Sequence, residues 1–301
     1  MKISIILPTY NRAGSYLKRA IDSVVKQTYD NWELIIVDNN SIDNTKDLIK
    51  SYESSKIKTY TINNDGNIAK SRNLGIDNST GDYLAFLDSD DYWKEDKLET
   101  CFNFLNLNKK YLGVCHSEDW VSKDDMFTKN YGPEKNFTFQ KLLNRGNCVS
   151  LSAMIVKKSI VIDVNNFSEN REFITAEDYD LWIKLAKNNN KIGFINKSLG
   201  IYQIHDNSES SNILRNTSAI INVINKYLKN DNKLLKNALS NCWLNTGKLL
   251  YKNNKKYQSL ISYFNSIKHA VFNVQPYIYI LILIIPYKII KPIINKYQLN
   301  S

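Results

Sequence analysis

Short apolar runs that end in polar clusters recur along the N-terminal part of the chain. Residues 3–7, 33–37 and 83–87 form three such runs. Continuous apolar runs of this length are typical of strands buried on both faces of a sheet. Between the first two, residues 15–27 carry apolar side chains at helical spacing. The pattern therefore predicts a strand–helix–strand unit with parallel strands.

The alternation of strands and helices continues beyond this unit. We expect further helices at residues 44–54, 68–78, 96–107 and 178–188, and further strands at 57–62, 112–116, 151–156 and 192–204. Residues 120–147 are polar and irregular, as acceptor-binding loops often are. The fold class predicted is α/β, a doubly wound and mostly parallel sheet with helices on both faces, followed by a basic helical region.

Polar clusters follow three of the predicted strands directly. They are Thr9-Tyr10-Asn11, Asp38-Asn39-Asn40 and Asp88-Ser89-Asp90-Asp91. Ligands of open α/β sheets bind outside the carboxyl ends of the strands. We therefore expect the three clusters to converge on one ligand site.

The carboxylates of Asp88, Asp90 and Asp91 are crowded at one strand end. Like charges held together repel unless a cation is present, and hard oxygen ligands suit Mg²⁺ or Mn²⁺. Such an ion neutralises a diphosphate as it leaves, so the cluster is a candidate metal site. The alternative interpretation is a solvated acidic turn.

The net charge of +10 is concentrated in the last third of the chain. Residues 212–301 hold 13 Lys and Arg residues against a single acidic one, Asp231. The first 211 residues are close to neutral, so we expect them to carry the chemistry. The tail is expected to face an anionic partner, either a phospholipid surface or a nucleic acid.

The tail also contains a short and strongly apolar stretch. Residues 277–287 are broken by Pro286 and fall short of the roughly 17 to 25 residues that span a bilayer. Three lysines follow at positions 288, 291 and 296. We expect an interfacial membrane segment at residues 276–296 rather than a spanning helix.

The four cysteines and the N-terminal sequence indicate the cellular compartment of the protein. The cysteines show no CxxC spacing and lie in apolar contexts, which predicts buried free thiols and a reducing environment. The first apolar run is too short for a signal peptide. The catalytic part is therefore expected in the cytoplasm.

Four motifs, taken in order, resemble the GT-A domain of family 2 glycosyltransferases over roughly residues 1–210. They are Ser-Ile-Ile-Leu-Pro-Thr-Tyr-Asn-Arg from Ser4, Leu-Ile-Ile-Val-Asp-Asn-Asn-Ser from Leu34, Asn-Ile-Ala-Lys-Ser-Arg-Asn-Leu-Gly from Asn67, and Gly-Asp-Tyr-Leu-Ala-Phe-Leu-Asp-Ser-Asp-Asp from Gly81. The resemblance is specific for the family and not for the sugar. It implies a catalytic domain at residues 1–211, divided into a nucleotide-sugar half (1–115) and an acceptor half (116–211), before the tail at 212–301.

The resemblance also implies a donor site. Pro8, Thr9 and Tyr10 would line the nucleoside pocket, and Asp38 would accept a hydrogen bond from N3 of uracil. Arg72 would lie near the base or the diphosphate. The alternatives are a turn or cap role for Asp38 and a plain surface salt bridge for Arg72.

Further donor and metal contacts are expected at the acidic cluster. Asp88 and Ser89 would contact the nucleotide, and Asp90 would be the direct metal ligand. Asp88 and Asp91 would support the metal, and His205 resembles the histidine that often closes this domain near the metal or diphosphate.

A second carboxylate pair, Glu177 and Asp178, is expected at the start of a helix. In similar family members the catalytic base sits there, and Asp178 is our candidate, with Glu177 beside it. A base that takes the acceptor proton during in-line attack predicts inversion at the anomeric carbon. The alternative is that both acids merely favour the helix N-terminus. Tyr179 and Trp182 would stack on an acceptor sugar unless they belong to the core.

The predicted enzyme is an inverting, metal-dependent hexosyltransferase that uses a UDP-sugar, with glucose or galactose expected. The acceptor expected is a lipid-linked saccharide such as N-acetylglucosamine on a polyprenyl diphosphate, in O-antigen or capsule assembly. The enzyme would lie peripherally at the cytoplasmic face of the inner membrane, with an anionic membrane surface and no nucleic acid as partner.

Three other protein classes are alternatives to this enzyme. The Gly-rich signature of nucleotidyltransferases and the GxGxxG motif of NAD enzymes are both absent after the first strand. The remaining alternative is a non-catalytic basic protein that binds membranes or nucleic acid through a degenerate nucleotide-binding domain.

Overall fold

The computed structural model describes residues 1–52, 54–123, 125–205 and 212–283. These residues divide into two compact units. The first holds residues up to 142 and from 147 to 205, and the second holds 143–146 and 212–283. The domain boundary predicted at residue 211 lies outside the described residues and stays a prediction, as does the division after residue 115, which falls within a strand.

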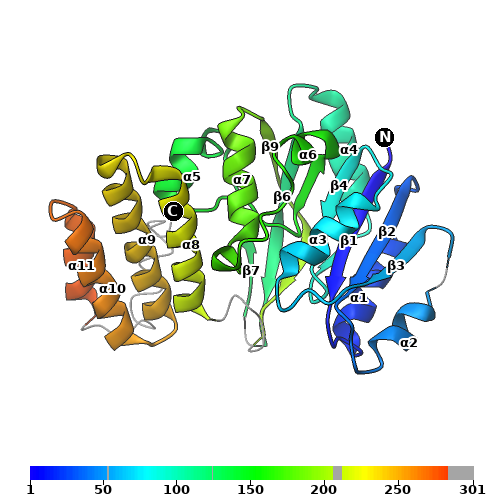
Figure 1. Cartoon of the computed structure of the whole chain (residues 1–301), viewed down its shortest axis with the longest axis horizontal. Coiled ribbons are helices and arrows are strands. Elements are labelled where there is room, and N and C mark those ends of the chain that lie inside the picture. The colour runs from blue at the N-terminus through cyan, green and yellow to red at the C-terminus, as the bar shows by residue number, and fades with distance from the viewer. Residues whose placement is uncertain (53, 124, 206–211, 284–301) are drawn as a thin grey trace. The chain divides into compact units, whose positions relative to one another are not determined.

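The first unit is built on one mixed sheet (Figure 1). Its strands are β1 (Ile3–Thr9), β2 (Trp32–Asp38), β3 (Ile57–Thr61), β4 (Tyr83–Phe86), β5 (Tyr92–Trp93), β6 (Gly113–Val121), β7 (Met126–Lys129), β8 (Met154–Lys157) and β9 (Ile192–Gln203). They run in the order β3-β2-β1-β4-β8-β6-β9-β5, and β7 pairs with β6. The four strands from β3 to β4 are parallel, whereas β8 is antiparallel to both of its neighbours.

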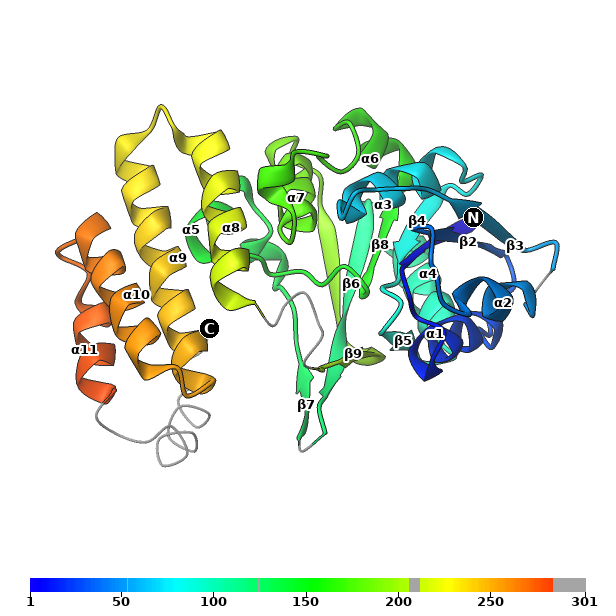
Figure 2. The ribbon, with the colours of Figure 1, turned by 60° about the horizontal axis from the view of Figure 1, so that its bottom comes forward.

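Helices cover both sides of this sheet. They are α1 (Ser15–Val25), α2 (Thr45–Lys50), α3 (Ile68–Asp77), α4 (Lys97–Leu107), α6 (Lys158–Asp163) and α7 (Glu177–Lys187), with short 3₁₀ turns at Glu134–Asn136 and Arg171–Phe173. A further helix, α5 (Phe139–Arg145), begins in the first unit and ends in the second. Figure 2 shows α3, α6 and α7 on one side and α1 and α4 on the other. All residues of β1 and β2 are buried, as their continuous apolar runs predict. The α/β architecture expected from the alternation is confirmed.

The interpretation of residues 120–147 as irregular is only partly right. β6 extends to Val121 and turns back through β7 as a hairpin, and α5 follows. The prediction missed the hairpin because its outer strand is short and carries mixed polar and aromatic residues without strict alternation.

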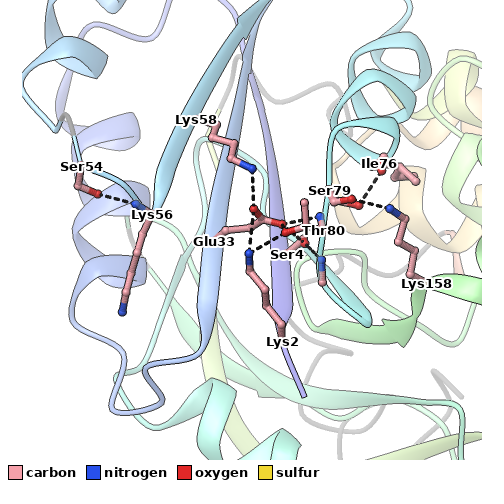
Figure 3. A network of polar contacts seen from close by, with 11 residues as sticks. Lys2, Ser4, Glu33, Ser54, Lys56, Lys58, Ile76, Ser79, Thr80 and Lys158 are labelled. Carbon is pink, nitrogen blue, oxygen red and sulfur yellow. Dashed lines mark hydrogen bonds and ion pairs between the residues drawn. The ribbon is translucent and has the colours of Figure 1, made fainter.

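At the amino ends of the parallel strands, Glu33 holds four segments together (Figure 3). It is 2% exposed and accepts hydrogen bonds from Ser4 Oγ at 2.6 Å and from both the backbone N–H and the hydroxyl of Thr80. Lys2 and Lys58 form ion pairs with it at 3.3 and 3.0 Å. Burial acts to raise the pKa of Glu33, but these donors outweigh it and lower the pKa to about 2.

Glu33→Gln should destabilise the protein by about 2 kcal/mol at pH 7. Because the folded-state pKa lies below the unfolded-state value near 4.5, this contribution is complete above that pH and is lost as the pH falls towards 2. Denaturant unfolding between pH 7 and pH 3 measures it, with Asp30→Asn as the control, since the Asp30 side chain is 95% exposed. A difference between Glu33→Gln and wild type that stays constant over this range would contradict the network's role.

The second unit is helical. It contains α8 (Ile213–Leu228), α9 (Asn232–Lys252), α10 (Lys256–His269) and α11 (Val274–Ile282). Tyr263 and Tyr279 pack with Leu244 in its core, and Gly247 makes this possible because a Cβ there would lie 2.3 Å from the Tyr263 ring. The basic helical region predicted after the sheet is confirmed.

The apolar end of the tail is described only in part. Within the described residues, none of the helices has the length and apolar character needed to cross a membrane. The predicted interfacial segment begins in α11, and its residues 284–296 lie outside the described residues. Of the four cysteines, Cys101 and Cys115 are buried free thiols, whereas Cys148 and Cys242 are half-buried.

Candidate donor and catalytic site

The first two polar clusters meet at the carboxyl edge of the sheet. The Asn39 N–H donates to the Thr9 carbonyl at 2.9 Å, and the Asn11 N–H donates to Ser41 Oγ at 2.8 Å. Asn11 and Asn40 both have a positive φ, at 47° and 52°. Asn tolerates this left-handed conformation better than most residues, which explains why Asn follows both strands.

The residues predicted to line the nucleoside pocket differ in exposure. Asp38 is 1% exposed, and its carboxylate accepts hydrogen bonds from the backbone N–H and the hydroxyl of Ser41. Thr9 and Pro8 are buried, whereas Tyr10 is 53% exposed. Asp38 thus has the turn role that was its alternative interpretation, and its contact with uracil stays a prediction.

Arg72 lies at the centre of the site. Its guanidinium donates to Asp88 Oδ1 at 2.9 Å and to Glu177 Oε1 at 2.5 Å, so it joins the end of β4 to the start of α7. Arg72 is 3% exposed, which rules out the plain surface salt bridge. One cation between two carboxylates keeps both acids in place, and breaking such a buried pair is costly.

The electrostatics of this bridge follow from burial and charge. Burial acts to lower the pKa of Arg72, but the charges of Asp88 and Glu177 outweigh it and raise the pKa above its usual value. For Asp88 burial raises the pKa, Arg72 opposes the rise and Asp90 adds to it. Arg72 thus offsets part of the cost of burying the Asp88 carboxylate beside Asp90.

Asp90 points to the opposite side of the cluster. Its Oδ2 lies 2.9 Å from His205 Nε2 and 3.4 Å from Arg12 Nη2. The Tyr16 ring stacks on His205 at 5.1 Å between ring centroids. The sequence predicted His205 near this cluster but assigned no role to Arg12, although Arg12 closes the first motif.

Asp91 and Ser89 are more enclosed. Asp91 is 2% exposed, and its carboxylate accepts hydrogen bonds from Ser152 Oγ at 2.7 Å and from the Gln203 N–H at 3.0 Å. Burial and the nearby Asp90 and Glu118 carboxylates raise the pKa of Asp91 well above its usual range. Ser89 is 9% exposed. Asp91 thus anchors the cluster to β9 and to the loop before β8.

The donor atoms of the cluster fit a hard divalent ion in type. Asp90 raises the pKa of both Asp88 and Asp91, a crowding of negative charge that a cation would relieve. Among the described residues, however, no three acidic, His or Cys side chains are arranged as a complete metal-binding set. A metal here would need oxygen ligands from elsewhere, such as the diphosphate and water.

The start of α7 presents the second acid pair. Thr175, just before the helix, has φ +82°, which is unusual for a β-branched residue and marks local strain. Its N–H donates to Glu177 Oε2 at 2.8 Å. Asp178 is half-buried and accepts from the Tyr179 N–H at 2.6 Å and from Asn147 Nδ2 at 3.3 Å. Burial, and then the charge of Glu177, raise the pKa of Asp178 to about 7.

The acceptor contacts predicted at α7 are wrong. Trp182 is 0% exposed and Tyr179 is 2% exposed, and the Tyr179 hydroxyl donates to the Leu142 carbonyl inside the unit. Both rings belong to the core, because most residues of α7 are buried. Neither the Tyr179 ring nor the Trp182 ring is exposed enough to stack on a sugar.

Two family models match the chain. The model of "Glycosyl transferase family 2" matches residues 4–161, and that of "Glycosyl transferase family group 2" matches residues 83–299. Together they include every residue of the site described above.

Curated relatives and solved structures agree with these models. The Escherichia coli UDP-Glc:alpha-D-GlcNAc-diphosphoundecaprenol beta-1,3-glucosyltransferase WfgD is 32% identical over 233 residues, which are 76% of this chain and 87% of WfgD. WfaP, an E. coli enzyme named for the same activity, is 30% identical over 70% of this chain and 80% of its own length. The crystal structure of S. aureus TarS 1-349 with UDP-GlcNAc superposes with a TM-score of 0.66 at 19% identity, covering 89% of this chain and 81% of that one. This likeness shows the GT-A fold.

Proposed function

This chain belongs to glycosyl transferase family 2, and on that premise we propose that it moves a hexose from a UDP-sugar to a lipid-linked saccharide. The donor proposed is UDP-glucose, with UDP-galactose as the other hexose donor to test. The acceptor proposed is N-acetylglucosamine on a polyprenyl diphosphate, because WfgD and WfaP are named for that acceptor. The product would enter O-antigen or capsule assembly.

The observation that carries this proposal is the Arg72 bridge. Arg72 is 105 residues from Glu177 in sequence, yet its side chain joins the acidic cluster after β4 to the acid pair at the start of α7. A donor diphosphate at the cluster and an acceptor hydroxyl at Asp178 would then meet within one site. Holding both reactants in one geometry is itself a large part of catalysis.

The proposed mechanism is a single displacement with inversion. Asp178 accepts the proton of the acceptor hydroxyl while the oxygen forms a bond to the anomeric carbon of the sugar. The bond from that carbon to the UDP oxygen breaks on the opposite face, and UDP leaves with the electron pair. Glu177 is bound to Arg72 and to the Thr175 N–H, so we assign it to positioning rather than to proton transfer.

We propose that Mn²⁺ or Mg²⁺ binds at Asp90 and His205, with Asp88 close by. The ion would neutralise charge on the departing diphosphate. Asp91 is held by Ser152 and Gln203, so we assign it to holding the cluster in place.

We propose that the second unit keeps the enzyme at the cytoplasmic face of the membrane. Phe272 is 98% exposed, Val274 65% and Leu281 70%, at the start of and along α11. The surrounding tail carries the excess of Lys and Arg. Apolar side chains beside basic ones favour the surface of an anionic bilayer.

Ligand-induced stabilisation tests whether the chain binds UDP, on which the proposal depends. UDP at about 100 times its dissociation constant should add about 2.7 kcal/mol to the free energy of unfolding, and Mn²⁺ should increase that effect. Thermal unfolding with UDP, with Mn²⁺ and with both measures it, and ADP is the matched control. Equal transitions in all samples would contradict a UDP-sugar site.

Deletion of residues 272–301 should release the protein from membranes. The deletion removes the exposed apolar residues at α11 and three lysines, at positions 288, 291 and 296. Sedimentation with anionic vesicles measures binding, and retained UDP protection shows that the first unit stays folded. If the truncated protein sediments with the vesicles to the same extent as the full chain, the proposed membrane role of this segment is wrong.

A further inference from the structure

Three aromatic side chains form a row across β7, β6 and β9. Phe127 is paired in register with Trp120, and Trp120 is paired with Tyr202. Residues paired in register lie on the same face of a sheet. The ring centroids of Trp120 and Tyr202 are 4.5 Å apart with planes at 22°, and those of Trp120 and Phe127 are 5.8 Å apart. We call these three residues the aromatic row.

Phe127 is the exposed end of the aromatic row, whereas Trp120 and Tyr202 are half-buried. Cross-strand aromatic pairs do stabilise hairpins, and this accounts for the stacking of Trp120 on Tyr202. It does not account for Phe127, which is 48% exposed at the hairpin that projects from the sheet (Figure 2). An exposed aromatic ring that continues into two half-buried ones is available to contact a ligand.

The aromatic row lies beside the acidic cluster. Gln203, the residue after Tyr202, donates its N–H to Asp91 at 3.0 Å. His205, two residues further on, contacts Asp90 at 2.9 Å. At the rise of an extended chain, the distance from Tyr202 to His205 is about 10 Å. A sugar ring on the row would therefore be close to the proposed donor diphosphate.

Polar groups around Trp120 fix its ring and add positive charge. The indole N–H donates to the Tyr131 hydroxyl at 3.0 Å, and that hydroxyl donates to the buried Glu118 at 2.7 Å. Lys129 Nζ lies 4.0 Å from the Trp120 ring centroid. Tyr202 and Lys129 thus cover the Trp120 ring, so a ligand would contact the rings of Phe127 and Tyr202. Aromatic rings next to an ammonium group suit a ligand that combines a sugar ring with an anionic group.

We propose that the aromatic row binds the acceptor: Phe127 and Tyr202 contact the sugar that is carried on a diphosphate, Trp120 holds Tyr202 in place, and Lys129 supplies positive charge for that diphosphate. This inference rests on the proposed function and names the acceptor surface of the same site. It replaces Tyr179 and Trp182, whose rings are buried. The C–H groups of a pyranose ring lie well against the electron-rich face of an aromatic ring.

Acceptor kinetics of Phe127→Leu and Tyr202→Leu test the proposal. Both variants keep an apolar side chain and lose the ring, so each should raise the KM for the acceptor about three- to tenfold. The KM for the UDP-sugar and the protection by UDP should not change. Met126→Ala is the matched control, because Met126 is 68% exposed on the same hairpin strand and its side chain points to the other face.

The acceptor should be offered in two forms, a water-soluble short-chain diphosphate sugar and the same sugar diphosphate on a long lipid in vesicles. A raised acceptor KM in both forms supports sugar binding by the aromatic row. An unchanged acceptor KM in both forms would overturn the proposal. A KM that rises only with the vesicle form, together with weaker binding to vesicles, would also overturn it, because the hairpin would then contact the membrane and not the sugar. Wild-type turnover tests the proposed function independently of these variants.

Discussion

Asp178→Asn should lower the rate of sugar transfer by about 10²- to 10⁴-fold while leaving UDP protection intact. The amide keeps the size of the side chain and can still accept from the Tyr179 N–H, but it cannot take a proton from the acceptor hydroxyl. Asp163→Asn is the matched control, since Asp163 is an exposed aspartate at the end of α6 in the same unit. The measurements are steady-state transfer and UDP-dependent thermal unfolding.

The pH dependence of the wild type sharpens this prediction. Burial and the neighbouring Glu177 raise the pKa of Asp178 to about 7, and a base must be ionised to act. Activity should therefore fall as the pH drops below about 7, over a range where an ordinary aspartate is still fully charged. If Asp178→Asn transfers sugar at more than a tenth of the wild-type rate, another residue must be the catalytic base.

Asp90→Ala should abolish measurable transfer, with a loss of at least about 10²-fold. The substitution removes the carboxylate that contacts both Arg12 and His205 and, on our proposal, the direct ligand of the metal ion. Charge on the departing diphosphate would then lack its main counter-charge. Transfer should be measured over a series of Mn²⁺ concentrations.

The control for Asp90→Ala is Asp65→Ala, which removes a carboxylate that is 55% exposed in a loop. The control should transfer at the wild-type rate. If Asp90→Ala keeps near-normal activity at every Mn²⁺ concentration, the acidic cluster is not the diphosphate site, and the assignment of Asp90 and His205 to the metal fails with it.

Much of the fold could be predicted because the parallel strands β1 and β2 are buried on both faces. In β1 and β2 burial requires an apolar residue at nearly every position, so the pattern is visible without any long-range information. The polar clusters after these strands follow from the same geometry, since ligand sites form where parallel strands end.

The parts that could not be predicted depend on contacts between distant segments. The Arg72–Glu177 pair links two helices 105 residues apart, and nothing near either residue indicates its partner. Trp182 could be an exposed stacking residue or a core residue on sequence grounds, because helical spacing alone does not show what covers that face of α7. In the folded protein that face is covered, and Trp182 is buried.

The aromatic row illustrates the same limit on the acceptor side. Trp120, Phe127 and Tyr202 come from three strands, and only the register of the β6–β7 hairpin and of β9 brings them into one line. A one-residue slip in either pairing would move a ring to the other face of the sheet.

Transfer to a defined acceptor tests the central claim most directly. A panel of UDP-sugars is incubated with synthetic N-acetylglucosamine on a lipid diphosphate and Mn²⁺, and the product is identified by mass and NMR. We predict that one UDP-hexose, UDP-glucose first, yields an acceptor enlarged by one hexose in β linkage, with release of UDP. A hexose in α linkage would contradict the single displacement by Asp178, and no product from any UDP-sugar would contradict the proposed function itself.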